Sequence, residues 1–154
     1  MSLYFPMFVD LTQKNILFVG AGKIALRRLV SIYDFAGSVT VVAPEAVPGI
    51  EQLADEGCIE FHCRRFGEED LAGTDIAIIA TGHAGTDARI ADMCRRRGIL
   101  VNVAGDSSLC DFYFPGIVRD DPVVVGVTAC GEDHKLAAET AAKIREMMGQ
   151  LDAD

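Results

Sequence analysis

A short glycine-containing segment near the start of the chain has the residues and the spacing needed to hold a phosphate group. Gly20 and Gly22 follow the apolar run Ile16–Val19, and Ala25 opens a helical pattern. In such a turn the first glycine allows the sharp bend, the second lets a pyrophosphate approach the backbone, and the alanine lets helix and strand pack closely. Amides of the first helical turn attract the anion. The segment predicts a dinucleotide site, with a glycine-rich turn that binds nothing as the alternative.

Three polar residues follow other apolar runs and could do chemistry in the same crevice. Glu45 could bond the ribose 2′-hydroxyl of NAD, or it could only cap the next helix. Asp106 could act as a general base or polarise an N–H group of the substrate, or it could form an Asx turn with Ser107 and Ser108. His83 is a second candidate proton carrier, or an exposed loop histidine. No basic residue lies near Glu45 along the chain, which favours NAD over NADP.

The spacing of apolar residues predicts strands and helices in alternation, an order that would bring these residues together. Apolar runs such as Ile76–Ala80 are typical of strands buried on both faces of a parallel sheet. The expected strands are 15–19, 38–43, 59–63, 76–80 and 99–103, and the expected helices are 22–35, 48–56 and 85–97. This is a doubly wound, Rossmann-like α/β fold, in which ligands bind beyond the carboxyl ends of the strands. The predicted cofactor contacts are Gly20, Ala21, Gly22, Lys23, Ile24, Ala43, Glu45, Thr81 and Gly82.

The pattern changes after residue 105, so we expect an NAD-binding domain at 1–105 and a second element at 106–154. Its expected parts are a strand over Gly116–Arg119, a turn at Asp120–Pro122, a strand over Val123–Thr128 and a helix over Lys135–Met148. So short an element cannot form a core of its own. We therefore expect it to mediate a homodimer, with packing against its own chain as the alternative.

Composition excludes several classes of partner. The net charge of -9 argues against nucleic acid and against an anionic membrane surface. No apolar run is long enough to span a membrane, and no leader pattern opens the chain, so we expect a cytoplasmic protein. Five cysteines without a Cys-x-x-Cys pair predict reduced thiols. A metal site around Cys58, His62 and Cys63 is not expected, because strand alternation places His62 and Cys63 on opposite faces.

Four segments resemble one known family over nearly the whole chain. They are Tyr4–Leu11, the glycine loop with its basic pair at Val19–Arg28, the run Val101–Val103 with Leu109–Pro115, and Pro122–Thr128 before the last helix. Together they are similar to the N-terminal module of siroheme synthase, whose stand-alone forms are precorrin-2 dehydrogenases and in some cases also ferrochelatases. An ordinary Rossmann protein has no reason to carry the third segment, which makes it the most specific of the four.

The resemblance implies an NAD-dependent oxidation of precorrin-2 to sirohydrochlorin, with the tetrapyrrole in a cleft between the nucleotide domain and a partner subunit. It implies that a crevice aspartate, here Asp106, serves the dehydrogenase and any chelatase reaction, with no protein metal ligands. Because the substrate carries many carboxylates, positively charged side chains should face it in the cleft. The substrate residues that follow from this resemblance are Asn102, Arg119, His134 and Lys135.

The chain departs from the family pattern in three places. Gly105 stands where the family usually has an aspartate, and the carboxylate lies one place later at Asp106. In the family, the turn before the last helix is rich in serine and glycine and contains a proline, whereas this chain has Thr128–His134 there. The last expected helix stops near Met148, and we expect a separate polypeptide to supply the helical region that longer members use to complete the cleft. Two other functions stay open: a non-catalytic homologue that binds a dinucleotide or a tetrapyrrole as sensor, carrier or partner subunit, and an NAD-dependent dehydrogenase of another small metabolite.

Overall fold

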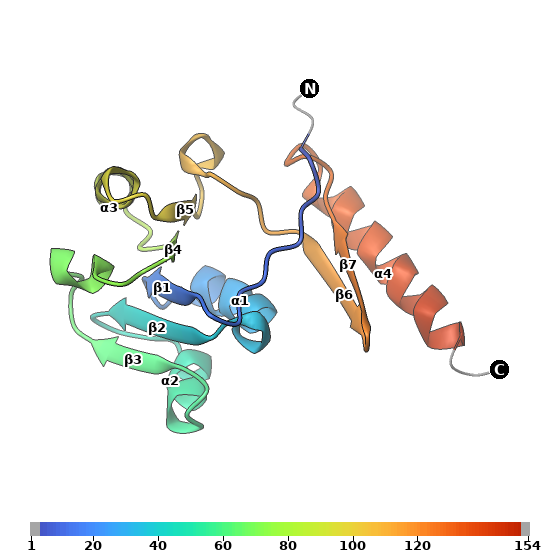
Figure 1. The fold of residues 1–154 in the computed structure, drawn as a ribbon, viewed down its shortest axis with the longest axis horizontal. Coiled ribbons are helices and arrows are strands. Elements are labelled where there is room, and N and C mark those ends of the chain that lie inside the picture. Colours follow the sequence, from blue (N-terminus) through green and yellow to red (C-terminus); the bar gives the residue numbers. More distant parts are fainter. Residues whose placement is uncertain (1–3, 152–154) are drawn as a thin grey trace. The chain divides into compact units, whose positions relative to one another are not determined.

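A computed structural model describes residues 4–151 of the chain, which fall into two compact units (Figure 1). Val9–Phe112 form one unit. The other contains the chain from Tyr113 onward together with the N-terminal residues up to Phe8.

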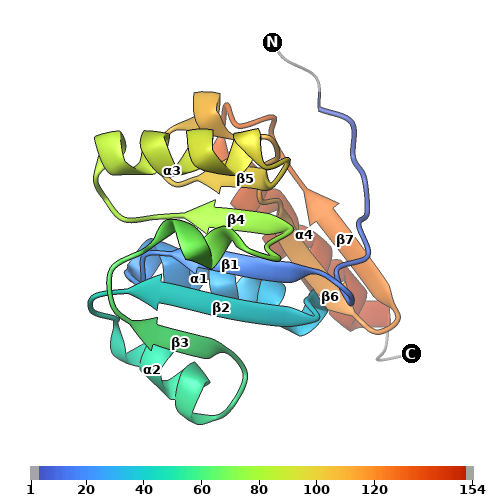
Figure 2. The ribbon, with the colours of Figure 1, turned by 60° about the vertical axis from the view of Figure 1, so that its left-hand side comes forward.

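The larger unit is built on a five-stranded parallel sheet with the strand order β3-β2-β1-β4-β5, visible as stacked arrows in Figure 2. Its strands are β1 (Asn15–Val19), β2 (Ser38–Ala43), β3 (Glu60–Cys63), β4 (Ile76–Ile79) and β5 (Leu100–Val103). The order reverses between β1 and β4, so the connections leave these two neighbours in opposite directions and open a crevice between them. The predicted doubly wound α/β sheet is confirmed.

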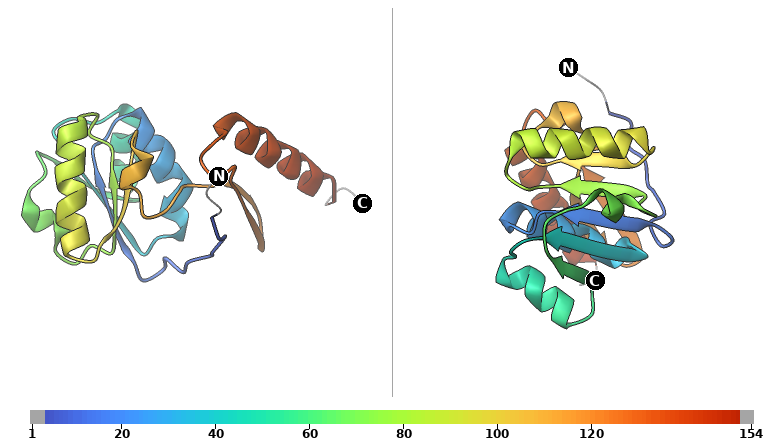
Figure 3. Two further views of the ribbon diagram at one scale, coloured as in Figure 1. Left: turned by 90° about the horizontal axis from the view of Figure 1, so that it is seen from above. Right: turned by 90° about the vertical axis from the view of Figure 1, so that its left-hand side faces the viewer.

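Three helices cover the sheet: α1 (Lys23–Ile32), α2 (Pro48–Asp55) and α3 (Ala84–Arg96). Figure 3 (left) shows α1 and α3 on opposite sides of the strands. Helix α3 packs its buried Ile90, Ala91 and Cys94 against Leu17, Val19 and the apolar residues of β4 and β5. Helix α1 ends at Ile32, earlier than the predicted Phe35, because the last turn tightens into a 3₁₀ helix, η1 (Tyr33–Phe35), before the turn at Gly37.

The segment that leaves the sheet after β5 turns back along that strand. The 3₁₀ helix η3 (Ser107–Leu109) leads into it. The Asp111 amide donates to Val101 O at 2.8 Å, the Val101 amide donates to Asp111 Oδ2 at 2.8 Å, and the Val103 amide donates to Cys110 Sγ at 3.2 Å. The compact unit therefore extends to Phe112, past the boundary at residue 105 that we predicted from the sequence, because these bonds tie residues 110–112 to β5.

The smaller unit is an antiparallel hairpin with one long helix, as predicted. Strands β6 (Gly116–Asp120) and β7 (Val123–Val127) are joined by Asp121 and Pro122 across a cis peptide bond, and α4 runs over His134–Leu151. Among residues 113–149 only Val118 and Ala141 are buried. Helix α4 begins one residue before the predicted Lys135 and extends to Leu151, past the predicted Met148. None of the helices within residues 4–151 is long and apolar enough to cross a membrane.

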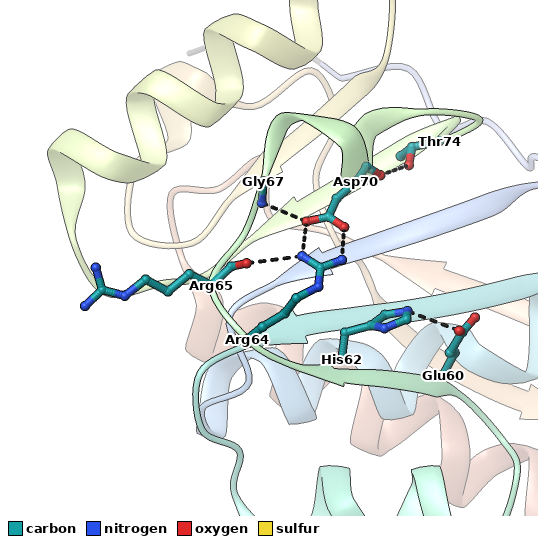
Figure 4. A network of polar contacts seen from close by, with 7 residues as sticks. All are labelled: Glu60, His62, Arg64, Arg65, Gly67, Asp70 and Thr74. Atoms are coloured by element: carbon teal, nitrogen blue, oxygen red, sulfur yellow. Dashed lines mark hydrogen bonds and ion pairs between the residues drawn. The ribbon is translucent and has the colours of Figure 1, made fainter.

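The connection between β3 and β4 is held by a buried carboxylate (Figure 4). Asp70, in the 3₁₀ helix η2 (Glu68–Leu71), accepts two hydrogen bonds from the Arg64 guanidinium, at 2.5 and 2.9 Å, and one from the Gly67 amide at 2.8 Å. The side chain of Asp70 is only 7% exposed. The Arg64 hydrogen bond, reinforced by the Gly67 amide, lowers the pKa of the Asp70 carboxyl below its usual 3.8, despite the opposing effect of burial.

We expect Asp70→Asn to lower the free energy of unfolding at neutral pH by about 1 to 2 kcal/mol, because the charged pair is lost. A carboxyl whose pKa is lowered by folding stabilises the protein above its unfolded pKa and loses that contribution as pH falls through the folded value. The difference between the wild-type protein and the variant should therefore hold from neutral pH down to about pH 5 and shrink below about pH 4. Urea unfolding across this pH range measures it. A difference that stays constant down to pH 3 would contradict the ionic origin.

Candidate functional site

A crevice of about 1380 Å³ opens at the carboxyl ends of the parallel strands. It exceeds the range of about 300–1,000 Å³ that holds drug-sized ligands, so a dinucleotide has room there. Loops after β1, β2, β4 and β5 form its walls, together with residues that follow β3. The crevice brings together every residue predicted for the cofactor, along with Asp106: Gly20, Ala21, Gly22, Lys23, Ile24, Ala43, Glu45, Thr81 and Gly82.

The two glycines of the loop after β1 play different parts. Gly20 has φ +104°, and a Cβ there would lie 2.2 Å from Ala80 O, so only glycine fits where β1 and β4 come together. Gly22 has an extended backbone (φ −86°), and a Cβ there would meet nothing within 4 Å. Glycine at position 22 is therefore not required by contacts within the protein. It leaves open the space that an approaching phosphate would occupy.

The start of α1 has the donors that an anion needs. Gly22 is the N-cap and supplies no side-chain acceptor, and no acidic residue lies in the first turn. The loop is fixed by backbone bonds, from the Gly20 amide to Val42 O and from the Val47 amide to Ala21 O, both at 3.0 Å. First-turn amides without a side-chain acceptor, on a rigid glycine loop, suit a pyrophosphate. The residues present therefore fit a nicotinamide dinucleotide.

A buried aspartate organises the loop after β4. Asp87, 3% exposed in the first turn of α3, accepts hydrogen bonds from the hydroxyl and the amide of Thr81. Thr81 Oγ1 in turn accepts from the amide of His83 at 3.2 Å, and the ring Nδ1 of His83 lies 3.0 Å from Thr81 O. The loop that borders the crevice is thus held from below by one carboxylate, which sequence reasoning did not identify.

We expect Asp87→Ala to lower the free energy of unfolding by about 1 to 3 kcal/mol, because the Thr81 amide and hydroxyl lose their buried acceptor. The loosened loop should also weaken NADH binding by about fivefold, the equivalent of about 1 kcal/mol. Urea unfolding and NADH fluorescence titration measure the two effects. Asp92→Ala is the matched control, because Asp92 lies on the same helix with a side chain 56% exposed. Equal behaviour of the two variants would contradict this role of Asp87.

Asp106 is exposed at the edge of the crevice, and it also forms the predicted Asx turn. Its Oδ1 accepts from the Ser108 amide at 3.0 Å and from the Ser108 hydroxyl at 2.6 Å. Within the described part of the chain, Oδ2 takes no hydrogen bond. The two interpretations of this residue are therefore compatible, because the turn fixes one oxygen and leaves the other available to a ligand.

The predicted substrate residues do not gather in this crevice. Asn102 is 2% exposed, accepts a short hydrogen bond from Arg28 and donates to Phe112 O at 2.7 Å. The Asn102 amide joins α1 to the segment after β5 and does not line this crevice, and its role towards the substrate stays a prediction. The remaining substrate residues are exposed in the smaller unit, and their role stays a prediction: Arg119, His134 and Lys135.

A basic residue does line the crevice close to the end of β2. Ala43 pairs with Cys63 across β2 and β3, so the residues that follow β3 reach the same edge of the sheet as Glu45. Arg65 lines the crevice with Glu45, although twenty residues of sequence separate them. No basic residue lies near Glu45 along the chain, but in the fold Arg65 lines the same crevice. Among the described residues, no group of three or more histidine, cysteine or acidic side chains is placed to hold a metal ion.

Comparisons with known proteins show which family the chain resembles. Residues 7–116 match the model of a family described as "Putative NAD(P)-binding". The chain is 33% identical over 147 residues to a siroheme synthase of Pseudoalteromonas atlantica, covering 96% of this chain and 32% of that protein. It is 38% identical over 141 residues to a siroheme synthase of Methylococcus capsulatus, covering 92% of this chain and 30% of that protein. The chain thus spans about a third of the length of these relatives.

A solved structure has the same fold. It is that of SirC, a precorrin-2 dehydrogenase, with a TM-score of 0.77 and 22% sequence identity over 93% of this chain and 70% of the other. At this identity the likeness concerns the fold. The family resemblance that the sequence predicted is confirmed by the matching family model and by the similarity to the siroheme synthases.

Proposed function

Because this chain belongs to the NAD(P)-binding family whose model spans residues 7–116, we propose that its crevice binds NAD and that the protein oxidises precorrin-2 to sirohydrochlorin. One observation carries the choice of substrate. The similarity to siroheme synthases covers 96% of the chain and so extends past residue 116 into the smaller unit. A dinucleotide-binding module that merely shared the nucleotide site would have no reason to match there.

Each residue has a defined task in this proposal. The amides after Gly22 hold the pyrophosphate, and Glu45 bonds the ribose hydroxyls at the end of β2. The Thr81–Gly82 turn, fixed by Asp87, shapes the floor of the crevice. NAD, when bound, accepts the hydride that the substrate loses. Asp106 takes the accompanying proton on its free oxygen Oδ2, while Ser108 holds Oδ1 in place.

Anaerobic incubation of the purified protein with precorrin-2 and NAD tests the proposal. NADH and sirohydrochlorin should appear in equal amounts, because each oxidation transfers one hydride. Ferrous iron added afterwards tests for chelatase activity, which would form siroheme faster than a protein-free control does. Oxidation of another metabolite, with precorrin-2 left unchanged, would favour a different dehydrogenase.

A specific observation favours a second candidate, a non-catalytic homologue that binds a dinucleotide or a tetrapyrrole. Gly105 occupies the place where the family resemblance implies an aspartate, and it has φ +88°. The carboxylate that lines the crevice after β5 is therefore that of Asp106, one place later in the chain. NAD binding measured by calorimetry, without any turnover of precorrin-2, would support this candidate and contradict the dehydrogenase.

The smaller unit supports a homodimer in this proposal. Leu136 and Met147 on α4 are 54% and 66% exposed, and Val123 on β7 is 50% exposed. A hairpin and a helix that bury so few side chains need a further surface to cover them, and a second copy supplies it. The tetrapyrrole, as the proposed substrate, and a partner copy are the two binding partners.

We expect the double variant Leu136→Glu with Met147→Glu to shift the protein from dimer to monomer by at least about tenfold in dissociation constant, because charges would have to be buried at the interface. Sedimentation velocity over a range of concentrations measures this. Lys143→Glu is the control, since Lys143 is an exposed polar position of the same helix. A wild-type protein that is monomeric at all concentrations would contradict the dimer.

A further inference from the structure

Glu45 and Arg65 occupy equivalent positions at the ends of neighbouring strands. Ala43 of β2 pairs with Cys63 of β3, and each of the two charged residues lies two places further on. The thiol of Cys63 also donates to Pro44 O at 3.4 Å, so the two strand ends are in contact. Both residues line the crevice at its β2–β3 end, next to the loop where Val47 bonds to Ala21 O.

The backbone of Arg65 is held in a fixed place. Arg64 pairs with Asp70 through two hydrogen bonds and donates a third to Arg65 O at 3.1 Å. The Gly67 amide donates to Asp70 as well, at 2.8 Å, so both sides of Arg65 are attached to one buried carboxylate. Figure 4 shows the Arg65 side chain extending away from this cluster.

The charged groups of both residues are available to a ligand. Glu45 and Arg65 are exposed, and within residues 4–151 neither side chain makes a hydrogen bond or an ion pair. A carboxylate suits the two ribose hydroxyls of NAD and repels a 2′-phosphate. A guanidinium has the planar set of donors that a phosphate prefers.

We propose that Arg65 is the residue that admits a 2′-phosphate, so that Glu45 and Arg65 together decide how far the crevice discriminates between NAD and NADP. This inference rests on the proposed dinucleotide function and extends it to specificity. With both charges present, NADPH binds measurably, and Glu45 makes the affinity for NADH higher than the affinity for NADPH. Without Glu45, Arg65 alone determines which dinucleotide the ribose end of the site prefers.

Fluorescence titrations of NADH and NADPH with the full chain test the proposal, without any need for turnover. Glu45→Gln should tighten NADPH binding by about tenfold, because the repulsive charge is removed. Arg65→Met should weaken NADPH binding by about tenfold and leave NADH within about threefold, because only the 2′-phosphate loses its partner. In the double variant, the gain from Glu45→Gln should largely disappear.

Two further measurements make the test specific. Arg27→Met removes the same charge from an exposed arginine on α1 that does not line the crevice, and it should change neither affinity. Raising the ionic strength should weaken NADPH binding more than NADH binding in the wild-type protein and equally in Arg65→Met. If Arg65→Met changes both affinities alike, or neither, the proposal is overturned while the dinucleotide site stands. If the wild-type protein binds neither NADH nor NADPH, the proposed function itself fails.

Discussion

Gly22→Asp is expected to weaken NADH binding by about a hundredfold or more and to leave the free energy of unfolding unchanged or higher. The new carboxylate would stand where the pyrophosphate approaches, and two such charges about 4 Å apart repel by roughly 4 kcal/mol near a protein surface. A Cβ at this position meets no protein atom, and the backbone is extended, so the fold has no reason to suffer. Aspartate is also a good N-cap and would satisfy the free amides of α1 itself. NADH titration and urea unfolding measure the two effects.

The control for this variant is Gly22→Asn, which has the same shape without the charge. It should weaken NADH binding less than Gly22→Asp does, and the difference between them reports the electrostatic part. Gly20 does not provide an equivalent test, because a Cβ there would collide with the backbone of Ala80 and disturb the sheet. Wild-type affinity in Gly22→Asp would show that the pyrophosphate does not bind at the start of α1.

Asp106→Asn is expected to lower kcat for precorrin-2 oxidation by about 10² to 10⁴, the range over which a positioned proton acceptor contributes. NADH binding should stay within about twofold, because the amide oxygen of asparagine still accepts from the Ser108 amide and preserves the turn. Initial rates of NADH formation and NADH titrations separate the two effects.

Ser108→Ala accompanies this variant as a structural control. It removes the hydroxyl donor from Asp106 Oδ1 and leaves the carboxylate in place. Turnover in Ser108→Ala should fall far less than in Asp106→Asn if the carboxylate itself takes the proton. Unchanged turnover in Asp106→Asn would remove this residue from the mechanism.

The sheet, the helices and most of the crevice could be predicted from the sequence, because each is marked by residues within a short segment. Continuous apolar runs such as Ile76–Ile79 mark central parallel strands, and glycines at the end of β1 mark the first turn. Once a parallel sheet is assumed, its strand ends fall at one edge by geometry alone. The predicted cofactor residues are therefore found together without any knowledge of side-chain contacts.

The features that the sequence did not predict depend on pairing between distant segments. Arg65 reaches the crevice only because β3 lies beside β2 in a particular register, which is a property of the pairing and not of either segment alone. Asp87 looked like an ordinary residue of an amphipathic helix, and its importance comes from the loop that it faces. The family-like segment that contains Asn102 does not show that its side chain bonds to Arg28, because Arg28 lies on a different element. The signal for Arg65 in the sequence is its position two residues past β3, which matches the position of Glu45 past β2.

The bonds between β5 and residues 110–112 have a consequence for solubility. β5 is the last strand of the sheet, and the outward amides of Val101 and Val103 would otherwise be open to pairing with another molecule. Exposed strand edges of this apolar kind are templates for aggregation. A nucleotide-binding fragment cut after residue 105 would uncover such an edge, whereas one cut after Phe112 would keep it sealed. The carboxylate of Asp111 and the thiol of Cys110 thus occupy the edge of β5 and keep it from pairing with a strand of another molecule.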